Sequence, residues 1–172
     1  MTTLIQKKIC LLGDFAVGKT SLVRRFVEGR FDDKYLGTIG VKISRKAIPR
    51  PYGQLNLLVW DMTGGEDLDS KARMSYLHGA AGALMVCDLT RRYTLDVFEN
   101  YLRQMRTLNP KVSLMFLANK ADLVNQRVIS DEDLWSTTKM LGGRSFCITS
   151  AKTGENVEAA FLQLADMIEE KK

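Results

Sequence analysis

The stretch GDFAVGKT at residues 13–20 decides the fold of this chain. It fits the pattern G-x-x-x-x-G-K-[ST], in which glycines let the backbone bend so that successive amides point inward at phosphate oxygens. A short apolar run at 9–12 precedes it and an amphipathic run at 22–27 follows it, which is the strand-loop-helix context that the pattern requires. Average residue frequencies give a chance match in a chain of this length odds below about one in a hundred. The stretch therefore predicts a phosphate-binding loop, called the phosphate loop below.

Two residues at the end of the phosphate loop are predicted to carry its chemistry. Lys19 is expected to reach the β- and γ-phosphates of a nucleotide, and the Thr20 hydroxyl is expected to ligate Mg²⁺. The helix that begins here adds the positive end of its dipole, which favours an anionic ligand.

Outside the phosphate loop, short apolar runs alternate with helical patterns. The runs lie at 9–12, 55–60, 83–87, 112–118 and 146–148. Runs that are apolar on both faces suit strands buried in a parallel sheet. Apolar residues at helical spacing over 95–105 and 157–168 predict helices between and after them, and Ser130 with Asp133 predicts a helix N-cap.

One segment departs from this alternation. Residues 41–48 alternate like a strand, residues 49–53 turn the chain, and the run at 55–60 returns, so these two strands are expected to pair antiparallel. We predict an α/β fold with a mostly parallel six-stranded sheet, one antiparallel edge strand and helices on both faces. In such sheets ligands bind beyond the carboxyl ends of the strands.

The composition limits the class of protein. The chain has 172 residues, of which 45% are hydrophobic and 26% charged, which predicts one folded domain over 1–172. The net charge of +5 is spread without a block of like charges, so no nucleic-acid partner is expected. No apolar stretch is long enough to span a bilayer, and no signal peptide or cysteine for a prenyl group is present. We therefore expect a cytoplasmic protein with no lipid anchor in this chain. Cys10, Cys87 and Cys147 lie in apolar runs and are expected to be buried thiols.

Two further loops predict which base the nucleotide carries. The tetrapeptide NKAD at 119–122 follows the run at 112–118, and SAK at 150–152 follows the run at 146–148. An aspartate carboxylate accepts together from the N1–H and the exocyclic amine of guanine, a pair of donors that adenine does not offer. A backbone amide of the second loop is expected to donate to the guanine O6. Both loops are expected at the same edge of the sheet as the phosphate loop.

With these motifs the chain resembles the Ras superfamily of small GTPases, and most closely its Rab-like branch, from Lys8 to about Ile168. YLGTIG at 35–40 resembles switch I, and WDMTG at 60–64 resembles the start of switch II. The resemblance implies a G domain that binds GTP or GDP with Mg²⁺, hydrolyses GTP and acts as a molecular switch. It also implies that protein effectors, and activating or exchange proteins, bind around Thr38 and from Gly64 to Tyr76.

The resemblance assigns roles to individual residues. Lys19, Thr38 and Gly64 are expected to act in catalysis, and Thr20, Thr38 and Asp61 to hold the metal, the last through water. The residues expected to bind the nucleotide are Gly13, Ala16, Val17, Gly18, Lys19, Thr20, Ser21, Phe31, Tyr35, Thr38, Gly64, Asn119, Lys120, Asp122, Ser150, Ala151 and Lys152. Phe31 is expected to pack against the guanine, with ordinary core packing as the alternative.

Three residues depart from the family pattern where hydrolysis occurs. Gly65 stands where the family usually has a glutamine that orients the attacking water. Phe15 stands third in the phosphate loop, where a phenyl ring would crowd the γ-phosphate and the room for an inserted arginine, and Thr63 replaces the usual alanine. We therefore predict weak intrinsic hydrolysis, since positioning supplies most of the catalysis in this chemistry. Glu66 or Asp67 could replace the glutamine, although a solvated helix start explains them as well.

Two other functions stay open at this point. The first is a GTP-loaded pseudoenzyme that acts as a constitutive protein-binding module, which the residues at 15 and 65 favour. The second is a phosphotransferase or ATPase, which the loop at 119–122 disfavours. Smaller signals have two interpretations each. Arg73, Met74 and Tyr76 fit an exposed switch surface, or core packing or a solvated face. The basic residues of 42–50 fit an effector surface for acidic partners, or a charged sheet edge that discourages strand addition, which is the preferred interpretation.

Overall fold

The computed structural model describes residues 3–34, 37–62, 64, 70–143 and 146–171. Tyr35, Thr63, Gly65, Glu66 and Asp67 therefore lie outside the described residues, and what was expected of them stays a prediction.

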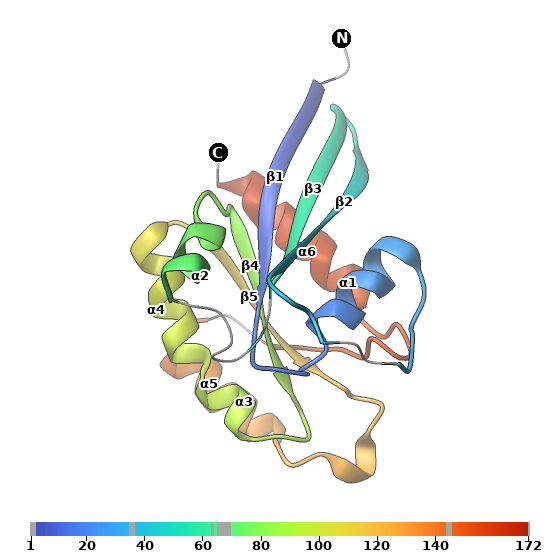
Figure 1. Cartoon of the computed structure of the whole chain (residues 1–172), viewed down its shortest axis with the longest axis vertical. Helices are drawn as coiled ribbons and strands as arrows, with labels where there is room; N and C mark the ends of the chain where they lie inside the picture. The colour runs from blue at the N-terminus through green and yellow to red at the C-terminus, as the bar shows by residue number, and fades with distance from the viewer. Residues whose placement is uncertain (1–2, 35–36, 63, 65–69, 144–145, 172) are drawn as a thin grey trace.

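A six-stranded sheet forms the centre of the molecule (Figure 1). Its spatial order is β2-β3-β1-β4-β5-β6. The strands are β1 (Thr3–Leu12), β2 (Val41–Arg50), β3 (Gly53–Met62), β4 (Gly82–Asp88), β5 (Ser113–Asn119) and β6 (Phe146–Ile148). Every neighbouring pair is parallel except β2 and β3, which are antiparallel. The predicted α/β fold, with one antiparallel edge strand, is confirmed.

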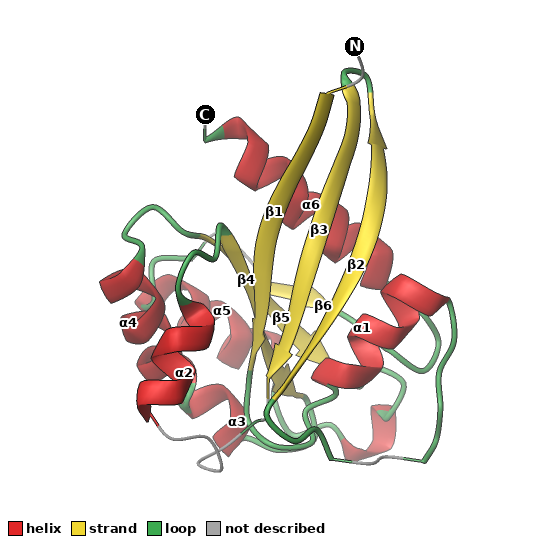
Figure 2. Cartoon of the chain, turned by 45° about the horizontal axis from the view of Figure 1, so that its top comes forward, coloured by secondary structure: helices red, strands yellow, loops and turns green. Residues whose placement is uncertain are grey.

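Helices cover both faces of this sheet (Figure 2). Helices α1 (Lys19–Glu28) and α6 (Val157–Glu170) pack on one face. The other face carries α2 (Ser70–Leu77), α3 (Tyr93–Asp96), α4 (Phe98–Leu108) and α5 (Asp131–Met140), and a 3₁₀ turn spans Val124–Gln126. Ser130 caps α5 by accepting from the Asp133 amide, as predicted. The helical pattern expected over 95–105 is confirmed, and it is divided between α3 and α4 at Val97, which has a φ of −77° and a ψ of −8°.

The core has two halves separated by the sheet. Alternate residues of β1 point to opposite sides, so Ile9 and Leu11 join the half under α1 and α6, whereas Cys10 and Leu12 join the other half. In the first half the rings of Phe26 and Phe161 stack with their centroids 4.1 Å apart, which joins α1 to α6. This burial on both faces explains why the central strands are apolar without alternation.

The three cysteines are free thiols, and two of them are fully buried. Burial raises the pKa of Cys10 and of Cys87 to about 12, so both stay protonated near neutral pH. Cys147 is only half-buried because it lies in β6, a three-residue strand at the edge of the sheet. The expectation of three buried thiols is therefore wrong for Cys147.

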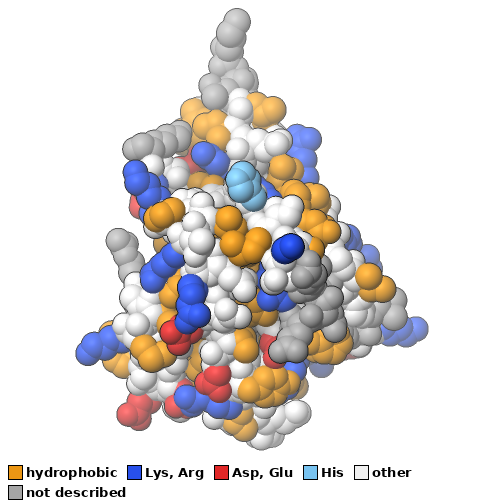
Figure 3. Space-filling view, turned by 60° about the vertical axis from the view of Figure 1, so that its left-hand side comes forward, with side chains coloured by type: hydrophobic (Ala, Val, Ile, Leu, Met, Phe, Trp, Pro, Cys, Tyr) orange, Lys and Arg blue, Asp and Glu red, His pale blue; other side chains and the backbone are white. Residues whose placement is uncertain are grey.

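The surface matches the spread of charge along the sequence. On the face shown in Figure 3, basic side chains are scattered among apolar, polar and acidic ones and form no single patch. Among the described residues, no helix is long and apolar enough to cross a membrane.

The basic residues of the β2–β3 hairpin differ in their surroundings. Arg50 Nη2 lies 2.7 Å from a carboxylate oxygen of Asp166 and 2.9 Å from one of Glu169, both on α6. Lys46 Nζ lies 5.4 Å from the centroid of the Phe26 ring. Arg50 is therefore not an isolated charge on the sheet edge, because its side chain ties the end of β2 to α6.

Candidate nucleotide site

Five loops meet at the carboxyl edge of the sheet. The phosphate loop follows β1, Gly64 lies just beyond β3, and β4, β5 and β6 are followed by the segments that begin at residues 89, 120 and 149. Because these five strands are parallel, their carboxyl ends share one edge of the sheet. The topology thus gathers residues that are more than 100 positions apart in the chain.

The phosphate loop is tightly packed against its neighbours. Gly18 has a φ of 103°, and a Cβ at this position would run into the side-chain amide of Asn119. Ala16 adopts a left-handed conformation with a φ of 58°, which is uncommon outside glycine. Only glycine fits at position 18, so the pattern of the loop follows from its packing.

Lys19 is the central cation of the loop. Its side chain is buried, and its Nζ donates to the backbone carbonyls of Gly13 at 2.8 Å and Asp14 at 2.9 Å. Burial lowers the pKa of Lys19 to about 8, against the opposing pull of Asp61 and Asp14. A buried ammonium held by neutral carbonyls is suited to an anionic ligand, because such a ligand offsets the cost of burying the charge.

Gly64 lies directly against this part of the loop. A Cβ placed on Gly64 would stand 2.6 Å from Lys19 Nζ and 2.6 Å from the carbonyl carbon and oxygen of Asp14. Two of the three residues predicted to act in catalysis, Lys19 and Gly64, are therefore neighbours. Together with Phe15, Thr20 and Thr38 they line a narrow cavity of about 10 Å³.

The three predicted metal ligands form a cluster of oxygens. Thr20 Oγ1 donates to Asp61 Oδ2 at 2.6 Å, and the Thr20 and Thr38 hydroxyls are 2.5 Å apart. Since the Thr20 proton is directed at Asp61, Thr38 is the donor in the second bond. Burial raises the pKa of Asp61, against the hydrogen bond from Thr20 and the charge of Lys19, which lower it.

The second carboxylate oxygen of Asp61 indicates that this cluster suits a cation. Asp61 Oδ1 is buried and has no hydrogen-bond partner among the described residues. A buried carboxylate oxygen without a partner is costly, and a hard divalent cation or its water would satisfy it. The described residues hold no group of three or more His, Cys, Asp or Glu side chains that could bind a metal. A Mg²⁺ ion at this cluster would therefore be bound by the Asp61 carboxylate, the hydroxyls of Thr20 and Thr38, and phosphate oxygens of the nucleotide.

A larger cavity of about 340 Å³ lies beside the phosphate loop. Most of its lining was predicted to bind the nucleotide, namely Ala16, Gly18, Ser21, Phe31, Asn119, Lys120, Asp122, Ala151 and Lys152. Asp122 is oriented by Ser150, whose Oγ donates to Asp122 Oδ1 at 2.7 Å. Phe31 lines the cavity and also packs on the core under α1 and α6, so both of its expected roles fit its position.

Asn119 and Lys120 connect this cavity to the phosphate loop. Asn119 Nδ2 donates to the Val17 carbonyl at 3.0 Å, and its Oδ1 accepts from Thr149 Oγ1 at 3.1 Å and from the Ala151 amide at 3.3 Å. Lys120 Nζ donates to the Ala16 carbonyl at 2.8 Å. The two residues therefore hold three loops of the site together.

Arg25 is a site residue that sequence reasoning missed. From α1 its Nε donates to the Ala151 carbonyl at 2.9 Å and its Nη2 to the Lys152 carbonyl at 2.5 Å, which fixes the last loop of the site. The available signal was spacing, because Arg25 stands four residues after Ser21 and so shares its helix face. Asp88 and Arg91 were also missed, although Asp88 is a charged residue directly after an apolar run.

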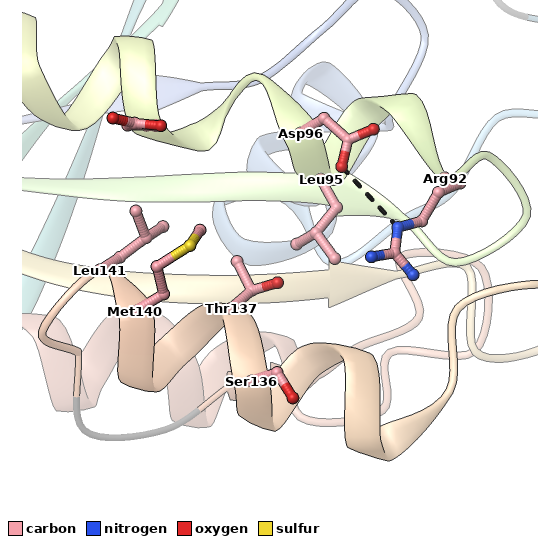
Figure 4. A pocket seen from close by; sticks show the side chains of 8 residues that line it. Arg92, Leu95, Asp96, Ser136, Thr137, Met140 and Leu141 are labelled. Atoms are coloured by element: carbon pink, nitrogen blue, oxygen red, sulfur yellow. Dashed lines mark ion pairs between the residues drawn. The ribbon is translucent and has the colours of Figure 1, made fainter.

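A further cavity of about 280 Å³ lies away from these loops, between α3 and α5 (Figure 4). Leu95, Met140 and Leu141 line it, and Arg92 Nε lies 3.7 Å from Asp96 Oδ1 beside it. None of the predicted site residues lines this cavity. The predicted residues instead gather at the carboxyl edge of the sheet.

The comparison with protein families agrees with the resemblance. The matching model is that of the Ras family, and it covers residues 8–170. Guanine-nucleotide binding and GTP hydrolysis are the general activities of that family, and its members act as molecular switches. Since the match spans nearly the whole sequence, this chain belongs to the Ras family of small GTPases.

Proposed function

We propose that this chain is a cytoplasmic, Rab-like switch that binds GTP or GDP with Mg²⁺ as one G domain, and that it hydrolyses GTP slowly. The observation that carries the proposal is the cavity of about 340 Å³, where the phosphate loop and both guanine loops meet. Its size suits a small ligand, and its neighbours provide a cation for phosphates at one end and a carboxylate for a base at the other.

Base selection is assigned to Asp122. Its carboxylate lies on the cavity wall and is held by Ser150 Oγ, so its direction is set before a ligand arrives. A fixed carboxylate favours a base with two adjacent donors, as guanine has. Adenine lacks that pair and would leave the carboxylate unsatisfied, which is costly in a partly enclosed site.

Magnesium is assigned to Thr20, Thr38 and Asp61. The unpartnered Oδ1 of Asp61 supports this assignment. When bound, Mg²⁺ would neutralise phosphate charge and polarise the bond that breaks. Both threonine hydroxyls would then bind the ion. Thr38 can do so because its segment lies against Thr20, with the two hydroxyls 2.5 Å apart.

Slow hydrolysis follows from Phe15 and Gly65. The Phe15 side chain is 47% exposed, and its Cε2 lies 3.5 Å from where a Cβ on Gly37 would stand. The ring thus reaches from the phosphate loop to the switch I segment and lines the narrow cavity that holds Lys19 and Gly64, so it would crowd an attacking water or an inserted arginine there. Gly65 has no side chain to orient that water, whatever its position.

The switch itself is assigned to the segments around Thr38 and Gly64. A γ-phosphate would bind Lys19 and Gly64 and draw Thr38 to the metal, and its loss would release both segments. Ile39 is 96% exposed next to Thr38 and offers an apolar contact to a protein effector. Arg73 lies within the sequence range proposed for partner binding, but its side chain is buried, with its Cζ 5.4 Å from the centroid of the Tyr101 ring. We therefore expect Arg73 to support this surface from beneath and not to contact a partner directly.

The alternative is a GTP-loaded pseudoenzyme that binds partners constitutively. Phe15 is the observation that favours it, since the same ring that excludes water would also exclude an arginine supplied by an activating protein. Under this alternative the purified protein contains GTP rather than GDP.

Nucleotide extraction followed by binding and single-turnover hydrolysis tests the proposal. We expect extracted guanine nucleotide, Mg²⁺-dependent GDP binding that ADP does not displace, and slow conversion of GTP. Asp122→Ala should weaken GDP binding, whereas Asp96→Ala removes a carboxylate at the other cavity and should not. Tight ADP binding would contradict the proposal, and a fast single turnover would contradict the slow-hydrolysis part.

A further inference from the structure

Asp88 sits at the end of β4 as a buried carboxylate with two cationic partners. Its side chain is 1% exposed, and its Oδ2 lies 2.9 Å from Arg91 Nε and 2.7 Å from Lys120 Nζ. Its Oδ1 accepts from the amide and the hydroxyl of Thr90 at 2.8 and 2.7 Å. Burial alone would raise the pKa of Asp88, but these hydrogen bonds outweigh it and hold the pKa below its usual range.

Both cations also bind the phosphate loop, at consecutive residues. Arg91 Nη2 donates to the Phe15 carbonyl at 2.8 Å, and Lys120 Nζ donates to the Ala16 carbonyl at 2.8 Å. Arg91 Nη1 also donates to the Tyr93 hydroxyl at 2.8 Å, which leaves its guanidinium little freedom to turn. One carboxylate therefore aims two cations at two neighbouring peptide groups.

The geometry of a trans peptide determines what this does to the loop. In a trans peptide the C=O and the following N–H point in opposite directions. With the carbonyls of Phe15 and Ala16 turned outward to Arg91 and Lys120, the amides of Ala16 and Val17 are turned the other way. The described residues contain no cis peptide bond, and Ala16 keeps its left-handed φ of 58° under this restraint.

We propose that Asp88 and Arg91 are positioning residues that hold the amides of Ala16 and Val17 toward the phosphates of a bound nucleotide. The proposal rests on the proposed function, because it concerns the same phosphate loop. Lys120 already belongs to the guanine-binding motif, whereas Asp88 and Arg91 belong to none of the motifs. A cation on a carbonyl also polarises its peptide, which makes the N–H on the other side a stronger donor.

Arg92 provides a matched control for Arg91. It is the next residue in the chain and also an arginine, but its Nη1 lies 2.6 Å from Asp133 and its Nε 3.7 Å from Asp96. Figure 4 shows Arg92 beside the cavity between α3 and α5, with Asp96 as its neighbour. Removing either arginine changes the net charge equally and breaks an ion pair with an aspartate, but only Arg91 donates to the phosphate loop.

The test compares the affinities of GDP and GMP for the full chain and its variants. Arg91→Ala and Asp88→Asn should weaken GDP binding by about 10- to 100-fold, as for loss of a charge-assisted hydrogen bond. Arg91→Ala should leave GMP binding unchanged, because GMP lacks the phosphate that lies deeper in the loop. The GMP comparison is made with this variant alone, because Asp88 also holds Lys120, which lines the base cavity. Arg92→Ala should bind both nucleotides like the wild type, and Arg91→Lys should recover part of the GDP affinity.

Different results overturn different claims. If Arg91→Ala binds GDP as tightly as Arg92→Ala does, or loses GDP and GMP affinity alike, the two residues do not position the amides. If the thermal midpoint shows that Arg91→Ala does not fold, the GDP and GMP affinities of Arg91→Lys are compared with those of Arg92→Ala instead. If the losses of GDP affinity caused by Asp88→Asn and Arg91→Ala simply add in the double variant, the two residues do not act together on the phosphate loop. A wild-type chain that binds no guanine nucleotide overturns the proposed function and this inference together.

Discussion

Replacing Gly64 by alanine tests how closely the switch II end approaches the phosphate loop. The new Cβ would stand 2.6 Å from the carbonyl of Asp14, whereas ordinary contact begins at 3.4 Å. The difference, about 0.8 Å, has to be taken up mainly by the segment at 64, because the Asp14 atoms belong to the backbone of the phosphate loop. A hydrogen bond of ordinary length that is stretched by this much is no longer a hydrogen bond.

The expected loss therefore concerns the γ-phosphate. If the Gly64 amide binds it, a non-hydrolysable GTP analogue should lose about 10- to 100-fold in affinity, equivalent to roughly 1.5–3 kcal/mol for a bond to a charged group. GDP should lose less, since it lacks that phosphate and is affected only through the nearby Lys19 Nζ.

Equilibrium displacement of a fluorescent nucleotide measures both affinities in one assay. Gly37→Ala is the matched control, because the nearest atom to its new Cβ is Phe15 Cε2 at an ordinary 3.5 Å. Equal losses for GDP and the GTP analogue in Gly64→Ala would refute the reasoning, as would an unchanged affinity for the GTP analogue.

Three further predictions concern charge, water and metal. Because burial lowers the pKa of Lys19 to about 8, GDP affinity should stay level below this pH and fall as Lys19 loses its proton above it. Between pH 8 and about 10.4 the unfolded chain binds more protons at Lys19 than the nucleotide-free folded chain, so folding stability should rise with pH there. Titrations of affinity and of thermal midpoint check both signs, and Lys19→Met should remove the pH dependence. Phe15→Gly combined with Gly65→Gln should speed single-turnover hydrolysis by roughly 100-fold, and a double variant as slow as the wild type would contradict this explanation. Asp61→Asn should abolish the slowing of GDP release by Mg²⁺, measured as the release rate with and without chelator, and a preserved Mg²⁺ effect would exclude Asp61 from the metal site.

Much of the fold could be predicted because its signals are local. The runs at 9–12 and 55–60 identify strands through their own composition, and the short turn at 49–53 implies the antiparallel pair. The N-terminal part of β1 was missed, because residues 3–8 hold only two apolar residues followed by three polar ones, and they form a strand by pairing with β3 as far back as Gly53. The division between α3 and α4 at Val97 leaves no trace in the apolar spacing, because Val97 keeps backbone angles close to helical ones.

The residues of the site also fall into those that local sequence patterns predict and those that they do not. The phosphate loop and the loop at 119–122 are contiguous motifs, so their residues could be named from the sequence. Arg91 contacts a carbonyl 76 positions away, and Arg25 contacts one 126 positions away. Such contacts depend on which loops the sheet brings together, and no local pattern encodes them.

The antiparallel pairing of β2 with β3 has a consequence for how this chain can change in length. Val41 is paired with Met62 at the site, and Arg50 is paired with Gly53 at the far end, across a turn of two residues. The β2–β3 pairing therefore sets where Thr38 lies relative to Asp61, and the turn of the hairpin is at the end of the pair that is far from the site. Adding one residue within β2 would slide Thr38 by about 3.4 Å and reverse which way its strand neighbours face. That shift exceeds the 2.5 Å between the Thr38 and Thr20 hydroxyls. Residues can accordingly be inserted at the turn without disturbing the oxygens, whereas a single insertion or deletion inside either strand would separate them.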